Sequence, residues 1–98
     1  GSDPARQLAT AERWLDGHPH DATLLLALGR LSLRNELWGK AREYLEASYA
    51  NRRDIQTCAE LVRLLEHMDE QAAAQKVLRQ GFGLMVNDLP ELPQPRRH

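Results

Sequence analysis

The amino-acid sequence predicts an all-α protein, with about five helices paired as antiparallel hairpins and stacked into a short solenoid. Aromatic residues make up only 5% of the 98 residues and β-branched residues are scarce, so a helical core of Leu and Ala is favoured over a β-sandwich. Apolar or small residues also recur 33 positions apart, which indicates a repeated helix-turn-helix unit. The matching pairs are Leu25 and Cys58, Leu28 and Leu61, Leu31 and Leu64, Ala41 and Ala74, and Leu45 and Leu78.

The first helix is expected over residues 3–17, and we interpret it as the second helix of a truncated preceding repeat. Asp3 and Pro4 suit the start of a helix, and Gly17 suits its end. Gly1 and Ser2 resemble the remnant of a removed expression tag, so the chain is expected to be a fragment of a longer protein. The apolar face of the helix has three- and four-residue spacing and consists of Leu8, Ala11, Trp14 and Leu15.

Residues 21–53 are predicted to form a full repeat of two helices, with a break at Asn35 and Glu36. Asp21 is expected to cap the first of these helices. That helix is apolar around most of its circumference, which indicates that it lies between neighbouring helices. We expect Ala41, on the second helix, to lie where two helices cross.

Residues 54–86 are predicted to form the second repeat together with an end cap. Asp54 and Asp69 are the expected N-caps of its two helices. Residues 84–86 are expected to extend the last helix and cover its open end, and residues 87–98, with three prolines, to be extended or disordered. The predicted apolar faces consist of Cys58, Leu61, Val62, Leu64 and Leu65, and then of Ala73, Ala74, Val77 and Leu78.

The first full repeat resembles the tetratricopeptide (TPR) pattern. The residues that carry the resemblance are Leu25, the pair Leu28-Gly29, Trp38 in the turn, the small Ala41, then Leu45 and Ser48. The second repeat departs from the pattern, because Val62 replaces the glycine and Gln71 the turn aromatic. The resemblance implies a right-handed TPR-like solenoid in which the first helix of each hairpin lines a concave face.

More narrowly, residues 18–81 resemble the C-terminal TPR region of the HemY family, bacterial proteins encoded with haem-biosynthesis genes. This resemblance implies an N-terminal membrane anchor, a link to haem (porphyrin) synthesis, and a location on the cytoplasmic side of the inner membrane. The residues that carry it are His18-Pro19 and those at 24–31, 33–35, 37–42, 44–48, 59–61 and 63–66.

The TPR alignment places a mixed apolar and cationic surface on the concave face, which we call the concave strip. Arginine suits carboxylates because its planar fork can bond them bidentately, so a partner peptide or helix with acidic groups is the expected ligand. The alternative is a solvated face with internal ion pairs, such as Arg63 with Glu60 or Glu66. The concave strip consists of Leu26, Arg30, Leu33, Arg34, Arg63 and His67.

Composition argues against several other functions. The net charge of −1 does not favour nucleic-acid binding, and a single cysteine, Cys58, does not suit a cysteine-based metal site. No catalytic, metal or cofactor site is predicted, so the chain is not expected to be an enzyme; a haem-pathway enzyme is one candidate partner. Two alternatives stay open: self-association as a homodimer through repeat ends near Trp14 and residues 84–86, and a regulatory subunit whose enzymatic chemistry lies elsewhere.

Overall fold

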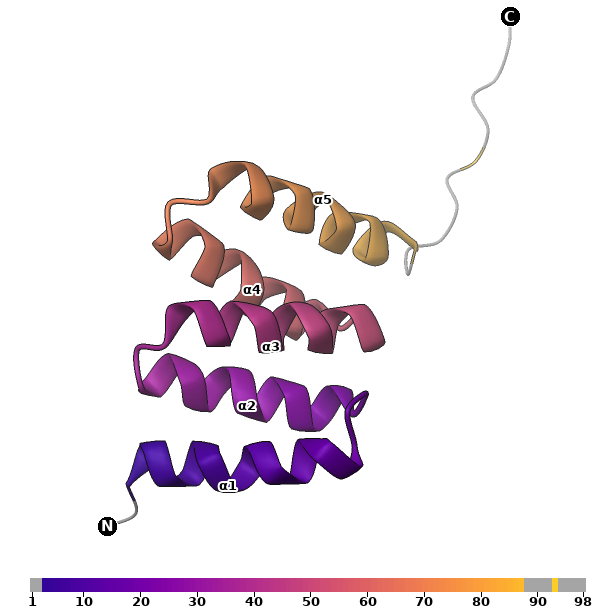
Figure 1. Cartoon of the computed structure of the whole chain (residues 1–98). Coiled ribbons are helices and arrows are strands. Elements are labelled where there is room, and N and C mark those ends of the chain that lie inside the picture. Colours follow the sequence, from indigo (N-terminus) through magenta and orange to yellow (C-terminus); the bar gives the residue numbers. More distant parts are fainter. Residues whose placement is uncertain (1–2, 88–92, 94–98) are drawn as a thin grey trace, which may run out of the picture.

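A computed structural model of the chain describes residues 3–87 and residue 93. The described part contains five helices and no strand, and each helix packs against the next in the sequence (Figure 1). The predicted all-α fold of stacked antiparallel hairpins is therefore confirmed. Apart from Asn87 and Pro93, the predicted tail lies outside the described residues. The helices are α1 (Pro4–Gly17), α2 (Ala22–Arg34), α3 (Trp38–Asn51), α4 (Ile55–His67) and α5 (Gln71–Asn87).

The first helix of each hairpin begins at an aspartate, and these two caps are 33 residues apart. Asp21 accepts hydrogen bonds from the amides of Thr23 at 3.0 Å and Leu24 at 3.1 Å. Asp54 accepts one from the amide of Gln56 at 2.8 Å. Each carboxylate satisfies amides that have no partner within the helix, which confirms the two predicted caps.

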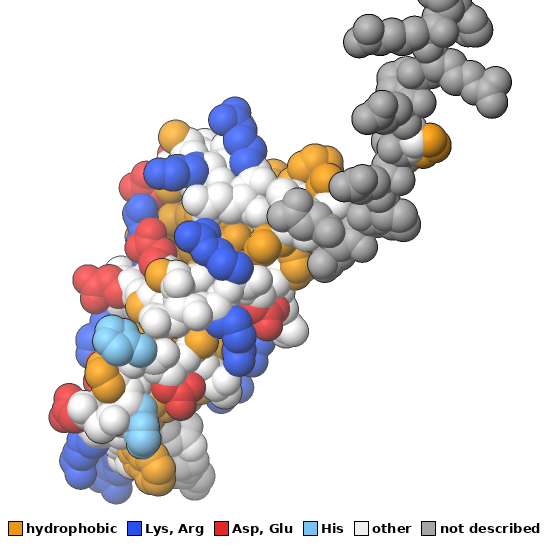
Figure 2. Space-filling view, turned by 90° about the vertical axis from the view of Figure 1, so that its right-hand side faces the viewer, with side chains coloured by type: hydrophobic (Ala, Val, Ile, Leu, Met, Phe, Trp, Pro, Cys, Tyr) orange, Lys and Arg blue, Asp and Glu red, His pale blue; other side chains and the backbone are white. Residues whose placement is uncertain are grey.

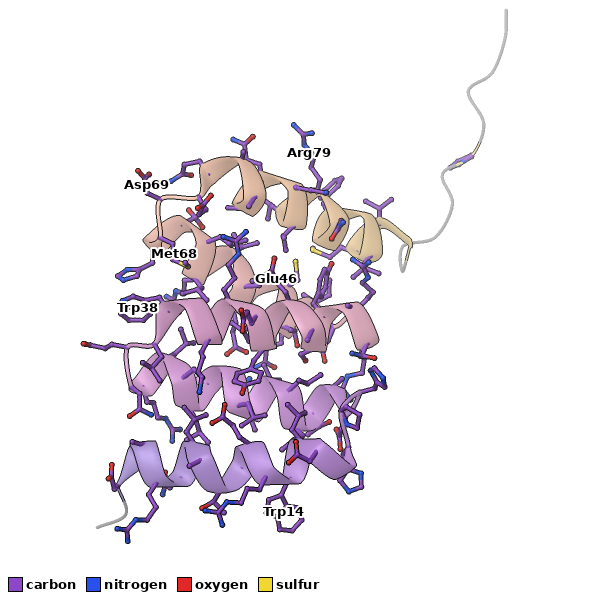
Figure 3. All side chains as sticks on the ribbon, viewed as in Figure 1. Trp14, Trp38, Glu46, Met68, Asp69 and Arg79 are labelled. Atoms are coloured by element: carbon purple, nitrogen blue, oxygen red, sulfur yellow. The ribbon has the colours of Figure 1, made fainter. Side chains whose placement is uncertain are left out.

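The turn inside each hairpin also repeats at 33 residues. Glu36 and Asp69 adopt left-handed backbone conformations, with φ angles of 56° and 59°. In each turn the backbone amide after the left-handed residue donates a hydrogen bond to the carbonyl five residues earlier, from Leu37 to Ser32 and from Glu70 to Leu65. These hydrogen bonds end α2 and α4 with a Schellman motif. The expectation that Asp69 caps α5 is therefore wrong: Asp69 ends α4, and α5 begins at Gln71 (Figure 3).

Replacing Glu36 with glycine is expected to stabilise the fold by about 0.5–1 kcal/mol, because a side chain at a left-handed position is strained and glycine relieves that strain. Asp69→Gly should stabilise less, because aspartate tolerates this conformation better than glutamate does. Urea unfolding measures both effects. Glu43→Gly, at an exposed position inside α3, is the matched control and should destabilise. A lower urea midpoint for Glu36→Gly would contradict the strain argument.

One apolar core runs through both hairpins. Leu28, Leu45 and Leu65 are fully buried. Ala41 is also completely buried, as its repeat position predicts, and its mate Ala74 is 4% exposed. The buried residues of α3, α4 and α5 belong to a single cluster, so the two hairpins form one unit.

The two hairpins differ at the position of Gly29, where α2 lies close to Leu45 of α3. A Cβ added to Gly29 would lie 2.8 Å from the Cδ2 atom of Leu45, so the glycine makes room for that side chain. The equivalent positions in the second hairpin hold Val62 and Leu78. Leu78 is 57% exposed, so its predicted place in the core is wrong. Val62 fills the space that a glycine would leave, and no helix within the described residues covers Leu78 from the other side.

The first helix, α1, docks on the stack through both apolar and polar contacts. Leu8 is buried, whereas Trp14 is 64% exposed and points away from the other helices (Figure 3). The Glu12 carboxylate accepts hydrogen bonds from the Tyr44 hydroxyl and, at 2.9 Å, from Lys40 Nζ, which ties α1 to α3. These bonds lower the pKa of Glu12 below its ordinary value. Trp14, predicted on the apolar face of α1, is therefore not part of the core.

Candidate functional site

The concave strip is distributed over the first helices of both hairpins. Arg34, Arg63 and His67 have exposed side chains. Leu26 and Leu33 are half-buried and pack against the core cluster, so much of their apolar surface is used within the fold. The two leucines can therefore offer only a narrow apolar edge to a ligand.

Arg30, by contrast, is committed to a partner inside the chain. Its Nε atom donates to Glu60 Oε1 at 2.9 Å, and its Nη2 atom donates to Glu60 Oε2 at 2.7 Å. This bidentate pair joins α2 to α4. The hydrogen bonds to Glu60 raise the pKa of Arg30 above its ordinary value. The sequence suggested Glu60 as a partner for Arg63, but the structure pairs Glu60 with Arg30, because the stacking of the second hairpin on the first brings these two side chains together.

The other charged members of the concave strip remain available. Within the described residues, the side chains of Arg34 and Arg63 form no ion pair or hydrogen bond. His67 packs its ring against Trp38 at the start of α3, with ring centroids 4.6 Å apart and an angle of 58° between the planes. The strip therefore presents two unpaired guanidinium groups, on consecutive hairpins, together with one exposed imidazole.

A second surface lies between α4 and α5 and was not predicted as a site. It is a groove of about 830 Å³, which we call the end groove. Figure 2 shows hydrophobic side chains gathering at this end of the stack, among acidic and basic ones. Its lining residues are Ile55, Gln56, Cys58, Ala59, Glu60, Val62, Arg63 and Glu66 from α4, and Leu78, Arg79, Gly81, Phe82 and Met85 from α5.

The 33-residue repeat contains a sequence signal that could have located the end groove. Phe82 occupies the position equivalent to Tyr49, which is only 4% exposed in the first hairpin. Phe82 itself is 65% exposed, and Met85 is 55% exposed. Residues 84–86 prolong the last helix, as predicted, but of the three only Leu84 packs on the core, while Met85 and Val86 stay exposed. The exposed apolar surface of α5 therefore begins further upstream, at Leu78.

Comparison with known proteins supports the repeat. Over 92 residues the chain is 28% identical to tetratricopeptide repeat protein 21A of Mus musculus. The chain has a TPR-like helical repeat. The aligned region covers 92% of this chain but only 7% of the mouse protein, so the chain spans a small part of that relative. No protein-family model matches, and no solved structure matches significantly.

Among residues 3–87, no group of three or more His, Cys, Asp and Glu side chains could hold a metal ion. Cys58 is buried, and its Sγ atom donates to the carbonyl of Val77 at 3.4 Å. No helix in the same region is both long enough and apolar enough to cross a membrane. The two surfaces described above are therefore the candidate sites.

Proposed function

We propose that this chain is a protein–protein interaction module that binds an acidic or C-terminal segment of a partner on its concave strip. The observation that carries the proposal is a pair of exposed arginines, Arg34 on α2 and Arg63 on α4, that have no ion-pair partner among the residues that the structure describes. Two guanidinium groups on consecutive hairpins can engage carboxylates along one extended or helical segment. TPR-like helical repeats are typical of scaffolds rather than enzymes, which supports the same class of function.

Within this proposal, Arg30 has a supporting role. A ligand carboxylate would have to displace Glu60 from two short hydrogen bonds before it could use this guanidinium group. We therefore assign Arg30 to the fixed geometry between α2 and α4. Leu26 and Leu33 add an apolar edge beside the charged groups, and His67 extends the strip at the end of α4.

The double variant Arg34→Ala/Arg63→Ala is expected to weaken partner binding while leaving the helix content unchanged. Because both side chains are exposed, each lost contact should cost about 0–1 kcal/mol, and the loss should shrink as salt rises. The measurement is fluorescence anisotropy with a labelled acidic peptide that ends in a free carboxylate. Arg13→Ala, at an exposed position on α1, is the matched control. Unchanged affinity of the double variant at low salt would overturn the proposal.

The HemY resemblance suggests a wider setting for this module. We propose that it belongs to a membrane-anchored protein linked to haem biosynthesis, with the module on the cytoplasmic side of the inner membrane and a haem-pathway enzyme as its partner. Pull-down with the full-length protein from a bacterial extract, followed by mass spectrometry, tests this setting. Recovery of a haem-pathway enzyme by the wild type, and its loss with Arg34→Ala/Arg63→Ala, is the expected result. Recovery of unrelated proteins alone would contradict it.

A further inference from the structure

The end groove occupies the place where another helix packs in the first hairpin. Leu45 and Tyr49 of α3 are 0% and 4% exposed, and both belong to the core cluster that α4 completes. Their repeat mates, Leu78 and Phe82, remain apolar but are 57% and 65% exposed. A groove lined by exposed apolar side chains as large as Leu78 and Phe82 usually marks a surface that another protein segment covers. The repeat therefore indicates that the missing cover is a helix.

One of the two helices that line the end groove, α5, itself has the apolar spacing of a helix that binds in such a groove. On α5, Leu78, Phe82 and Met85 follow the i, i+4, i+7 spacing with which an amphipathic helix anchors itself in an apolar groove. Pro90, Pro93 and Pro95 follow α5 in the sequence, and proline is unfavourable inside a helix. A groove and a matching helix on one surface are the requirements for a two-fold symmetric contact, in which each copy supplies both.

The charges of the end groove are compatible with self-pairing. The groove is lined by Arg63, Arg79, Glu60 and Glu66, but Glu60 is already paired with Arg30 of α2, so Glu66 is the lining carboxylate that is free to pair across a contact. Arg79 points outward from α5 at the end of the stack opposite to Trp14 (Figure 3). Arg63, Arg79 and Glu66 have no ion-pair partner within the described residues. In a two-fold contact, Glu66 of each copy can therefore pair with Arg63 or Arg79 of the other copy.

We propose that two copies of this chain associate through the end groove, with α5 of each copy packed in the groove of the other. This proposal goes beyond partner binding, because the surface is the outer face of the α4–α5 hairpin rather than the concave strip. The two surfaces share Arg63, whereas Arg34 belongs to the concave strip alone. The variant Arg34→Ala should therefore leave self-association unchanged, so either proposal can fail without the other.

Sedimentation velocity over a range of protein concentrations tests the proposal. The wild type is expected to form dimers, and Phe82→Glu to raise the dimer dissociation constant by about tenfold or more, because it places a charge at the centre of the apolar contact. Trp14→Glu is the matched control: this side chain is equally exposed, at 64%, and lies at the other end of the stack, so dimers should persist. Met85→Glu repeats the test should Phe82→Glu lose helicity by circular dichroism.

Three results would overturn the proposal. The first is a wild type that remains monomeric at all concentrations. The second is dissociation of the dimer by Trp14→Glu but not by Phe82→Glu or Met85→Glu, which would move the contact to α1. The third is a monomeric chain that dimerises only after truncation at Asn87, which would assign the groove to the chain's own C-terminal segment. Dimers that persist in the truncated chain and dissociate with Phe82→Glu would support the proposal.

Discussion

Gly29→Val is expected to destabilise the protein by about 1–3 kcal/mol, although Gly29 lies inside a helix where glycine is otherwise unfavourable. The first atom added at this position would lie 2.8 Å from Leu45 Cδ2 and 2.9 Å from Leu45 Cγ. Leu45 is fully buried, so its side chain has no free space to enter. The variant must either separate α2 from α3 or force Leu45 from its preferred rotamer. Urea unfolding followed by circular dichroism measures the loss.

The matched control for this prediction is Gly83→Val. Gly83 also lies inside a helix, but an added Cβ there meets nothing within 4 Å, so the urea midpoint should change little. Combining Gly29→Val with Leu45→Ala tests the cause directly. Leu45→Ala should cost less in the Gly29→Val background than in the wild type, because the smaller side chain relieves the clash. Strictly additive effects would show that the clash with Leu45 is not the cause.

Ala41→Leu is the other change with a large expected effect, a loss of about 1–3 kcal/mol. Ala41 is completely buried in the cluster that also holds Leu45 and Leu65. Leucine is nearly as good a helix former as alanine, so any loss reports overpacking and not helix propensity. The urea midpoint should fall while the dependence of the unfolding free energy on urea stays the same.

Ala72→Leu provides the matched control, because Ala72 is exposed near the start of α5. This variant should unfold at nearly the wild-type urea concentration. An unchanged midpoint for Ala41→Leu would count against the whole repeat alignment, since the alignment places this alanine where two helices cross. A fall in both variants would indicate a general effect of added leucine.

The sequence alone determined the features that depend on short-range chemistry or on the 33-residue period. Asp21 and Asp54 cap amides two or three residues away, so their role needs no knowledge of the rest of the fold. Leu28 and Leu61 could likewise be assigned to the core, because the period places both on the same side of equivalent helices. The number of helices and their pairing followed from these signals.

Tertiary structure decided the features that depend on which helices meet. The choice of Arg30 over Arg63 as the partner of Glu60 depends on how the second hairpin stacks on the first, and the spacing of residues within one helix contains no information on that arrangement. Leu78 and Leu45 occupy equivalent positions, yet only Leu45 is buried, because burial requires a neighbouring helix and not only an apolar side chain. A repeat pattern predicts the contacts inside each hairpin, whereas the exposure of Leu78 depends on whether a further helix packs beside α5, and none of the described helices does.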